Sequence, residues 1–261
     1  MVKIRKNHRT IKFAKFISYA FDGSVLAIPI FIAVVFFNNK NNNFNDVFMN
    51  FLITIFFIAL MPYLFILLLY KSGRISDLQI QKRKERLYPL LVINLSVIAG
   101  FCVLLATSPA KLLLTVYSIY LVSLPVISLI TFFWKISFHS SYITLFSIIY
   151  LIVFGKWAVA TVVLIPLVGW SRIKLKKHTL AQVVAGISIT AFAALSVLYF
   201  TGYLNSGYWA VNEILDLFKN TSVYLSIILP GFGIILLFLL LYMILGIYLR
   251  RKQSEKHYLN N

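Results

Sequence analysis

Negative charge and cysteine are both scarce in this chain. Among its 261 residues there are seven Asp and Glu and one cysteine, Cys102, and charged residues of either sign make up only 12% of the chain. A single cysteine excludes an intramolecular disulfide, and so little charge excludes an ordinary soluble domain. The few carboxylates are also poor material for a Mg²⁺ site, which relies on oxygen ligands of that kind.

Hydrophobic residues, in contrast, make up 61% of the chain, and its mean hydropathy is +0.88. Runs of about 20 apolar residues are long enough to cross a membrane as helices. We therefore predict an all-α, polytopic membrane helix bundle that forms a single integral membrane domain over residues 1–261. About eight spans are predicted, at Ile17–Phe37, Asp46–Tyr70, Tyr88–Ser108, Lys111–Trp134, Ser140–Phe154, Trp157–Trp170, Leu180–Tyr203 and Ser222–Leu249. The fifth and sixth are short, so we expect neighbouring residues to extend them.

The positive charge predicts an orientation. The net charge is +18, which in a soluble protein would indicate nucleic acid as a partner. With a cytoplasmic N-terminus, 21 of the 25 Lys and Arg fall on one side of the predicted spans, which is the bias that orients membrane proteins. We therefore expect a multi-pass protein of the cell (cytoplasmic or inner) membrane. Both termini would be cytoplasmic, with membrane lipids and not nucleic acid as partners.

Three basic clusters fall on the predicted cytoplasmic side. The first, Lys82–Arg86, precedes the third span, and the other two lead up to His139 and His178. Two spans separate each cluster from the next, and an even number of crossings returns the chain to the same face. Arginine binds phosphate oxygens bidentately. Of two histidines, one can attack phosphorus while the other protonates the leaving oxygen. The clusters therefore predict a site that handles phosphate.

In order along the chain, these clusters resemble the three motifs of the type 2 phosphatidic acid phosphatase superfamily. Ser171-Arg172, followed by five residues and His178, resembles the third motif, Ser137-Phe138-His139 the second, and the stretch from Gln79 to Arg86-Leu87 the first. Gln79 stands where the family has Lys, Phe138 where it has Gly, and Gln182 where it has the Asp that orients the nucleophile. The resemblance implies a six-helix phosphatase-like core at about residues 46–203, with the basic segment 1–16 and the span 222–249 outside it.

The resemblance also implies an activity. Members of the family hydrolyse lipid phosphates and polyprenyl diphosphates through a phosphohistidine intermediate, without a metal or a cofactor. His178 would be the nucleophile, His139 the acid that protonates the leaving group, and Gln182 the residue that orients His178. The residues expected to bind the substrate are Arg83, Arg86, Lys135, Ser137, Ser171 and Arg172. By analogy, a polyprenyl diphosphate is the leading substrate, ahead of phosphatidic acid or phosphatidylglycerol phosphate.

These features have second interpretations. The chain could be a non-catalytic membrane protein of the same fold that binds anionic lipid headgroups, and Lys82–Arg86 alone could set topology or contact such lipids. Thr179 and Gln182 fit a capping box that starts the seventh span. Asp22, a costly residue inside a span, is either functional or the partner of an interfacial hydrogen bond. A transporter is disfavoured because charges inside the spans are almost absent.

Overall fold

The computed structural model describes residues 2–37, 43–80 and 82–203, and within these ranges the regular secondary structure is entirely helical. All of them belong to one compact unit of the chain, Met1–Leu217. The prediction of an all-α fold is therefore confirmed for this part of the chain. The predicted eighth span, Ser222–Leu249, lies outside the described residues.

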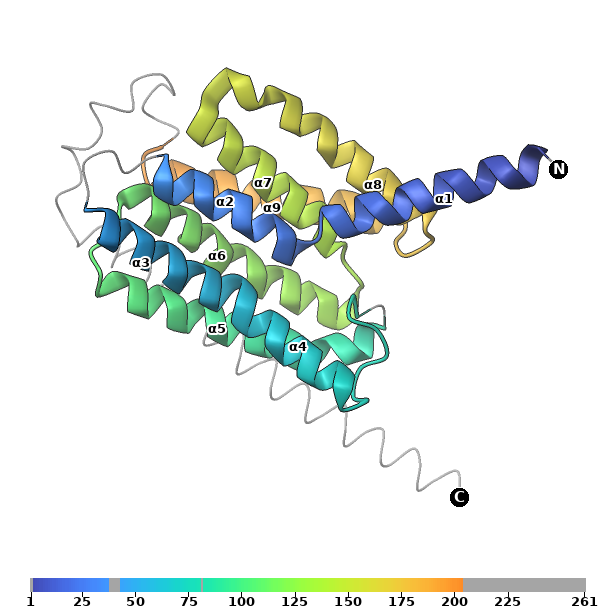
Figure 1. The fold of residues 1–261 in the computed structure, drawn as a ribbon, viewed down its shortest axis with the longest axis horizontal. Coiled ribbons are helices and arrows are strands. Elements are labelled where there is room, and N and C mark those ends of the chain that lie inside the picture. Colours follow the sequence, from blue (N-terminus) through green and yellow to red (C-terminus); the bar gives the residue numbers. More distant parts are fainter. Residues whose placement is uncertain (1, 38–42, 81, 204–261) are drawn as a thin grey trace. The chain divides into compact units, whose positions relative to one another are not determined.

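Nine α-helices, one π-helical turn and two 3₁₀ segments are found in the described ranges (Figure 1). In chain order they are α1 (Val2–Ala20), α2 (Gly23–Phe36), α3 (Phe44–Ile55), the π-turn η1 (Phe56–Leu60), α4 (Met61–Lys71), η2 (Arg83–Arg86), α5 (Leu87–Leu105), α6 (Lys111–Phe133), α7 (Phe138–Phe154), η3 (Gly155–Val163), α8 (Leu164–Lys174) and α9 (Leu180–Phe200).

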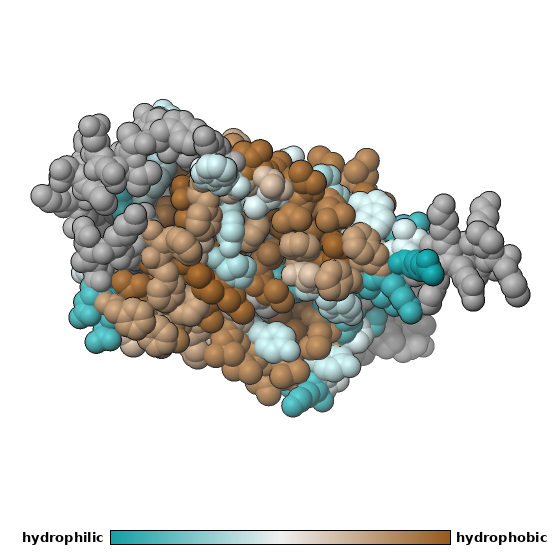
Figure 2. Space-filling view, turned by 45° about the horizontal axis from the view of Figure 1, so that its top comes forward, coloured by the Kyte–Doolittle hydropathy of each residue, from teal (hydrophilic) through white to brown (hydrophobic). Residues whose placement is uncertain are grey.

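Much of this helical surface is suited to lipid. Five helical segments of the described chain are long and apolar enough to cross a membrane: Phe44–Lys71, Arg83–Leu105, Lys111–Phe133, Trp157–Lys174 and Leu180–Phe200. The bent pair α1–α2 makes a sixth if it counts as one span, and α7 is apolar but shorter. Figure 2 shows hydrophobic residues covering the middle of the visible face, with hydrophilic residues toward its edges. The described unit is thus membrane-embedded.

At the predicted fifth and sixth spans, the structure has two α-helices joined by a 3₁₀ segment. α7 ends at Phe154 because Gly155 adopts a positive φ of 59°, a conformation that glycine takes at little cost. The chain continues as the 3₁₀ segment η3 before α8 begins at Leu164. As expected, residues beyond the predicted limits extend the sixth span, which reaches Lys174.

A local cause also explains the π-turn between α3 and α4. Pro62 has no N–H to donate, and its ring crowds the carbonyl one turn earlier, which a regular α-helix does not accommodate. The helix widens at η1 just before this proline. The carbonyl of Phe57 accepts a hydrogen bond of 2.5 Å from Ser96 Oγ on α5. The widened turn is thereby fixed to the neighbouring helix, and its residues Ile58 and Ala59 face a cavity.

The packing of the helices brings four chain segments to one end of the bundle. α6 is the most enclosed of the candidate spans. α7 packs against α2 and α9, while α1 packs along α8. In Figure 1, the start of α7, the end of α8, the start of α9 and the turn before α5 lie toward the same side of the described unit. These four segments carry the three basic clusters.

Candidate active site

A cavity of about 370 Å³ lies at this end of the bundle and has two chemically different parts. One part is polar and includes side chains from all three clusters. The other is an apolar wall formed by η1, α4, α5 and α6. Besides several tyrosines, the polar lining includes Asp22, Gln79, Arg86, His139, Arg172 and His178. The apolar wall includes Ile58, Ala59, Pro62, Ile66, Pro89, Leu90, Ile93 and Leu124.

The position of His139 is set by the start of α7. Ser137 is the N-cap of this helix, and its Oγ accepts a hydrogen bond from the backbone N–H of Ser140. The cap packs tightly against α9, because a Cβ on Gly186 would come within 2.7 Å of the carbonyl oxygen of Ser137. Ser141 Oγ also donates to the carbonyl of Gly186 at 3.2 Å. His139, in the first turn of α7, is therefore fixed on the cavity wall.

The position of His178 is set by the turn between α8 and α9. α8 ends in a Schellman motif, in which the N–H of Lys177 donates to the Arg172 carbonyl at 3.0 Å and the N–H of Lys176 to the Ile173 carbonyl at 2.9 Å. Lys176 takes the left-handed conformation that this motif needs, with φ of 54°. The motif places Lys177 and His178 directly beyond the end of α8, next to Arg172.

Gln182 serves both the helix and the histidine. The predicted capping box is present, with the N–H of Gln182 donating to Thr179 Oγ1 at 3.3 Å and the N–H of Thr179 donating to Gln182 Oε1 at 3.2 Å. The same Oε1 lies 3.2 Å from His178 Nδ1. Because an amide oxygen can only accept, Nδ1 carries the proton. His178 itself precedes α9, so the contact is made across the helix cap and not along one face of a helix.

His178 is held in its neutral form. Burial, together with the positive charges of Arg172, Arg86 and Lys135, lowers its pKa to about 3. With the proton on Nδ1, the lone pair of the neutral ring is on Nε2, and His178 lies on the cavity wall. A neutral imidazole with one nitrogen held and the other carrying a lone pair is the form that a nucleophile requires.

Four cations gather around the two histidines. Arg86 and Arg172 line the cavity and are only 6% and 2% exposed. Burial, followed by the charges of Arg86, Arg172 and Lys177, lowers the pKa of Lys135. Burial and then the charge of Arg172 lower the pKa of Lys177. Cations held close together, two of them buried and two half-buried, repel one another, and a bound anion relieves that repulsion. The polar part of the cavity therefore suits an anionic group.

Hydrogen bonds orient the two arginines in different ways. Arg86 Nε donates to the Ile80 carbonyl at 2.7 Å and Nη1 to the Ile136 carbonyl at 3.2 Å, while Phe138 lies under the guanidinium at 5.5 Å. Arg172 Nη1 donates to Ser18 Oγ, but its buried Nε has no partner among the described residues. An unsatisfied buried donor is costly unless a ligand takes it, which adds to the case for an anion here.

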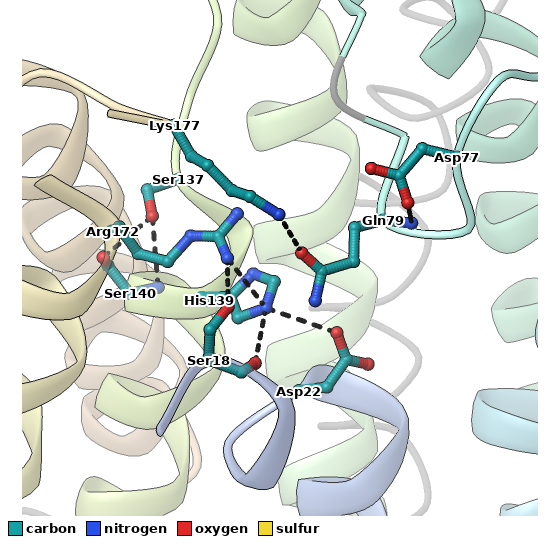
Figure 3. Close-up of polar contacts among 9 residues, drawn as sticks. All are labelled: Ser18, Asp22, Asp77, Gln79, Ser137, His139, Ser140, Arg172 and Lys177. Atoms are coloured by element: carbon teal, nitrogen blue, oxygen red, sulfur yellow. Dashed lines mark hydrogen bonds and ion pairs between the residues drawn. The ribbon is translucent and has the colours of Figure 1, made fainter. Parts of the chain in front are cut away.

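Lys177 was not singled out from the sequence, yet its ammonium group contacts Gln79 on the cavity wall. Nζ donates to Gln79 Oε1 at 2.6 Å, from the turn between α8 and α9 to the loop before α5. Figure 3 shows the two side chains reaching toward one another beside Arg172 and His139. A positive charge thus stands next to position 79, where the first motif of the phosphatase superfamily has lysine. The run Lys174-Leu175-Lys176-Lys177 in front of His178 was the available sequence signal.

Five predicted substrate-binding or catalytic residues do not line the cavity. Arg83 is exposed and donates to the carbonyls of Phe132 and Phe133. Ser137 acts as a helix cap, and Ser171 is buried in α8 with no hydrogen-bond partner for Oγ among the described residues. The other two support the site from behind: Gln182 holds His178, and Lys135 Nζ donates to the Lys177 carbonyl at 3.0 Å.

Asp22 also belongs to the site. Its Oδ2 lies 3.3 Å from His139 Nε2, and it lines the cavity. No group of three or more His, Cys, Asp or Glu that could hold a metal ion is found in the described ranges. No protein-family model, curated protein or solved structure matches the chain.

Proposed function

We propose that this chain is an integral membrane phosphatase that hydrolyses a phosphomonoester or diphosphate on a lipid. The observation that carries the proposal is the convergence of two histidines and two buried arginines on one cavity. They come from segments that are far apart in the sequence. The polar part of the cavity meets an apolar wall, as a lipid with an anionic head requires.

The reaction would proceed in two steps. In the first, His178 Nε2 forms a bond to phosphorus, the bond from phosphorus to the leaving oxygen breaks, and His139 gives a proton to that oxygen. In the second, water attacks phosphorus, the bond from phosphorus to His178 Nε2 breaks, the proton of the water goes to His139, and inorganic phosphate leaves. Arg86 and Arg172 would bind the equatorial oxygens and stabilise the charge on them in both transition states.

Two features support a lipid with a single long chain and more than one phosphate, such as a polyprenyl diphosphate. Two arginines on the cavity wall, with Lys135 and Lys177 close behind them, match the charge of a diphosphate better than that of a single phosphate group. A cavity of about 370 Å³ encloses only the head and the first part of a chain. The rest of the chain would lie in the bilayer. Phosphatidic acid and phosphatidylglycerol phosphate, with two acyl chains each, would be poorer substrates.

The proposal includes a topology. The helices within residues 46–203 would form a six-helix catalytic core in a bundle of eight spans, with the site on the cytoplasmic side. Single cysteines at Arg74→Cys and Ala106→Cys, in a Cys102→Ser background, test the sidedness because the two positions flank α5 and are exposed. Impermeant reagents should label the first from the cytoplasm and the second from outside. Labelling of both from one side would overturn this topology.

Phosphate release from lipid substrates tests the activity. Purified protein is given polyprenyl diphosphate, polyprenyl phosphate, phosphatidic acid and phosphatidylglycerol phosphate. We expect release that depends on His178 and Arg86. His178→Ala should abolish turnover and Arg86→Ala should lower it at least 100-fold, while Lys84→Ala, an exposed cation in the same 3₁₀ turn, serves as the control. Full activity of His178→Ala would overturn the proposal. Tight binding of these lipids without any turnover would instead identify a non-catalytic headgroup-binding protein.

A further inference from the structure

The two N-terminal helices lie before the segment on which the motif resemblance rests, yet they close the cavity beside His139. α2 packs against α7, α1 packs along α8, and the pair is bent by 45°. Three residues at or near the bend, Tyr19, Asp22 and Gly23, line the cavity. Figure 3 shows Ser18 and Asp22 on this segment directed at the ring of His139.

The bend frees a backbone carbonyl for His139. In a continuous α-helix the N–H of Asp22 would donate to the carbonyl of Ser18. Here it donates to the carbonyl of Tyr19 instead, at 3.3 Å. The Ser18 carbonyl lies 3.1 Å from His139 Nε2. The carbonyl and Asp22 Oδ2, at 3.3 Å, can only accept and lie closer to Nε2 than the donor Arg172 Nη1, at 3.5 Å, so Nε2 of His139 carries a proton.

Packing fixes the bend in this place. A Cβ on Gly23 would come within 2.3 Å of the ring of Tyr142 on α7, one turn beyond His139. Only glycine allows α2 to approach α7 so closely. Ser18 is 1% exposed, and its Oγ accepts a hydrogen bond from Arg172 Nη1. Carbonyl, carboxylate and hydroxyl groups of one segment are therefore held against both a histidine and an arginine of the site.

The charges around His139 make the carboxylate important. Arg172 approaches it from α8, with Nη1 at 3.5 Å from Nε2, and Lys177 and His178 approach from the turn before α9. These groups and the buried setting disfavour a positive charge on the ring. Among the described residues that these distances bring to the ring, Asp22 is the one with a negative charge. An acid catalyst that must be an imidazolium needs such a partner.

We propose that the bend between α1 and α2 is part of the active site, and that Asp22 is a positioning residue that maintains His139 as the protonated acid. The proton on Nε2 is held by Asp22 Oδ2 and the Ser18 carbonyl until the leaving oxygen of the substrate arrives. It then moves to that oxygen, and the attacking water returns it in the second step. This inference rests on the proposed phosphatase function and extends it to a segment outside the three motifs.

The pH dependence of kcat/KM tests this role. Activity that needs protonated His139 is lost as the pH rises, and removing a nearby carboxylate makes the ring lose its proton at lower pH. Asp22→Asn should therefore lower kcat/KM at pH 7.5 at least 10-fold and move the alkaline limb down by about one pH unit or more. Asp22→Glu should restore part of both. Asp46→Asn, an exposed carboxylate at the start of α3, should change neither.

A second readout does not depend on turnover. The chain has four histidines, so ¹⁵N-histidine labelling gives few ring signals, and His139→Gln assigns one of them. The titration midpoint of His139 should move to lower pH in Asp22→Asn. An active wild type in which this substitution changes neither the pH profile nor the midpoint would overturn the role of Asp22 and leave the proposed function standing. A wild type that releases no phosphate from any lipid would overturn the proposed function itself.

Discussion

Comparing Gln182→Ala with Thr179→Ala separates helix capping from the positioning of His178. The substitution removes the acceptor for His178 Nδ1 and the acceptor for the N–H of Thr179, both at 3.2 Å. A neutral hydrogen bond contributes about 0.5–1.5 kcal/mol net. If the bond to His178 contributes that much in the transition state, its loss slows turnover about 2- to 10-fold. Loss of the capping bond costs about 1 kcal/mol of stability in addition.

Thr179→Ala is the matched control, because it removes the other half of the capping box. Thr179 Oγ1 no longer accepts from the N–H of Gln182, while Gln182 Oε1 still reaches His178. We expect a stability loss of about 1 kcal/mol with turnover close to that of the wild type. Gln182→Glu keeps the length of the side chain and adds the charge that favours an imidazolium, so its turnover should equal or exceed that of the wild type.

The assay is single-turnover phosphate release at matched amounts of folded protein, checked by size-exclusion profile and melting temperature. The positioning role requires Gln182→Ala to be slower than Thr179→Ala at equal loss of stability. Equal rates in these two variants would show that Gln182 acts only as a helix cap. A Gln182→Glu variant slower than Gln182→Ala would refute the idea that His178 benefits from an acceptor at this position.

Three further predictions concern Lys177, the protonation of His178 and metal. Lys177→Ala should raise KM about 10-fold or more, because the phosphate of the substrate would lose its interaction with this charged donor, and such an interaction contributes about 1.5–3 kcal/mol. In that background Gln79→Lys should recover part of the loss, while the exposed Lys174→Ala should not change KM. Above pH 6.5 His178 is neutral in both the folded and the unfolded state. Below pH 6.5 only the unfolded state takes up the proton, because the pKa of His178 in the folded state is about 3. The wild type without phosphate should therefore lose up to about 1.4 kcal/mol of stability per pH unit relative to His178→Gln in thermal unfolding between pH 6.5 and 4.5. Turnover should persist in EDTA, and its loss and recovery with Mg²⁺ would contradict the histidine mechanism.

The sequence was sufficient to predict features set by hydrophobic length or by local spacing. The apolar runs predicted helices, and the Thr179–Gln182 spacing predicted a capping box that the structure contains. Counting crossings placed the clusters of His139 and His178 on one face, and both side chains line one cavity. Such features depend on neighbouring residues or on chain length, so they need no knowledge of how distant helices pack.

Features that depend on tertiary contact were not predictable in the same way. The direction of Arg83 depends on the end of α6, whose carbonyls it contacts. The reach of Lys177 depends on a left-handed residue at Lys176, which no residue rule assigns to lysine. The role proposed for Asp22 depends on the bend between α1 and α2 and on the close approach of α2 to Tyr142, which the absence of a Cβ on Gly23 allows. Asp22 had been identified as either functional or interfacial, but not as a partner of His139.

The departures from the family pattern change in meaning once these contacts are considered. A chain that had lost the activity would be expected to lose charges at Gln79 and Gln182 without replacement. Instead, the ammonium of Lys177 lies against Gln79. The carboxylate of Asp22 lies beside His139, the second histidine of the site. The site therefore contains a lysine beside position 79 and a histidine–carboxylate pair, although the carboxylate faces His139 and not His178. Buried like charges are costly, so a cation cluster that bound no anion would only destabilise the fold. This favours a working phosphate site over a vestigial one, and it makes Lys177 and Asp22 the substitutions that distinguish the two.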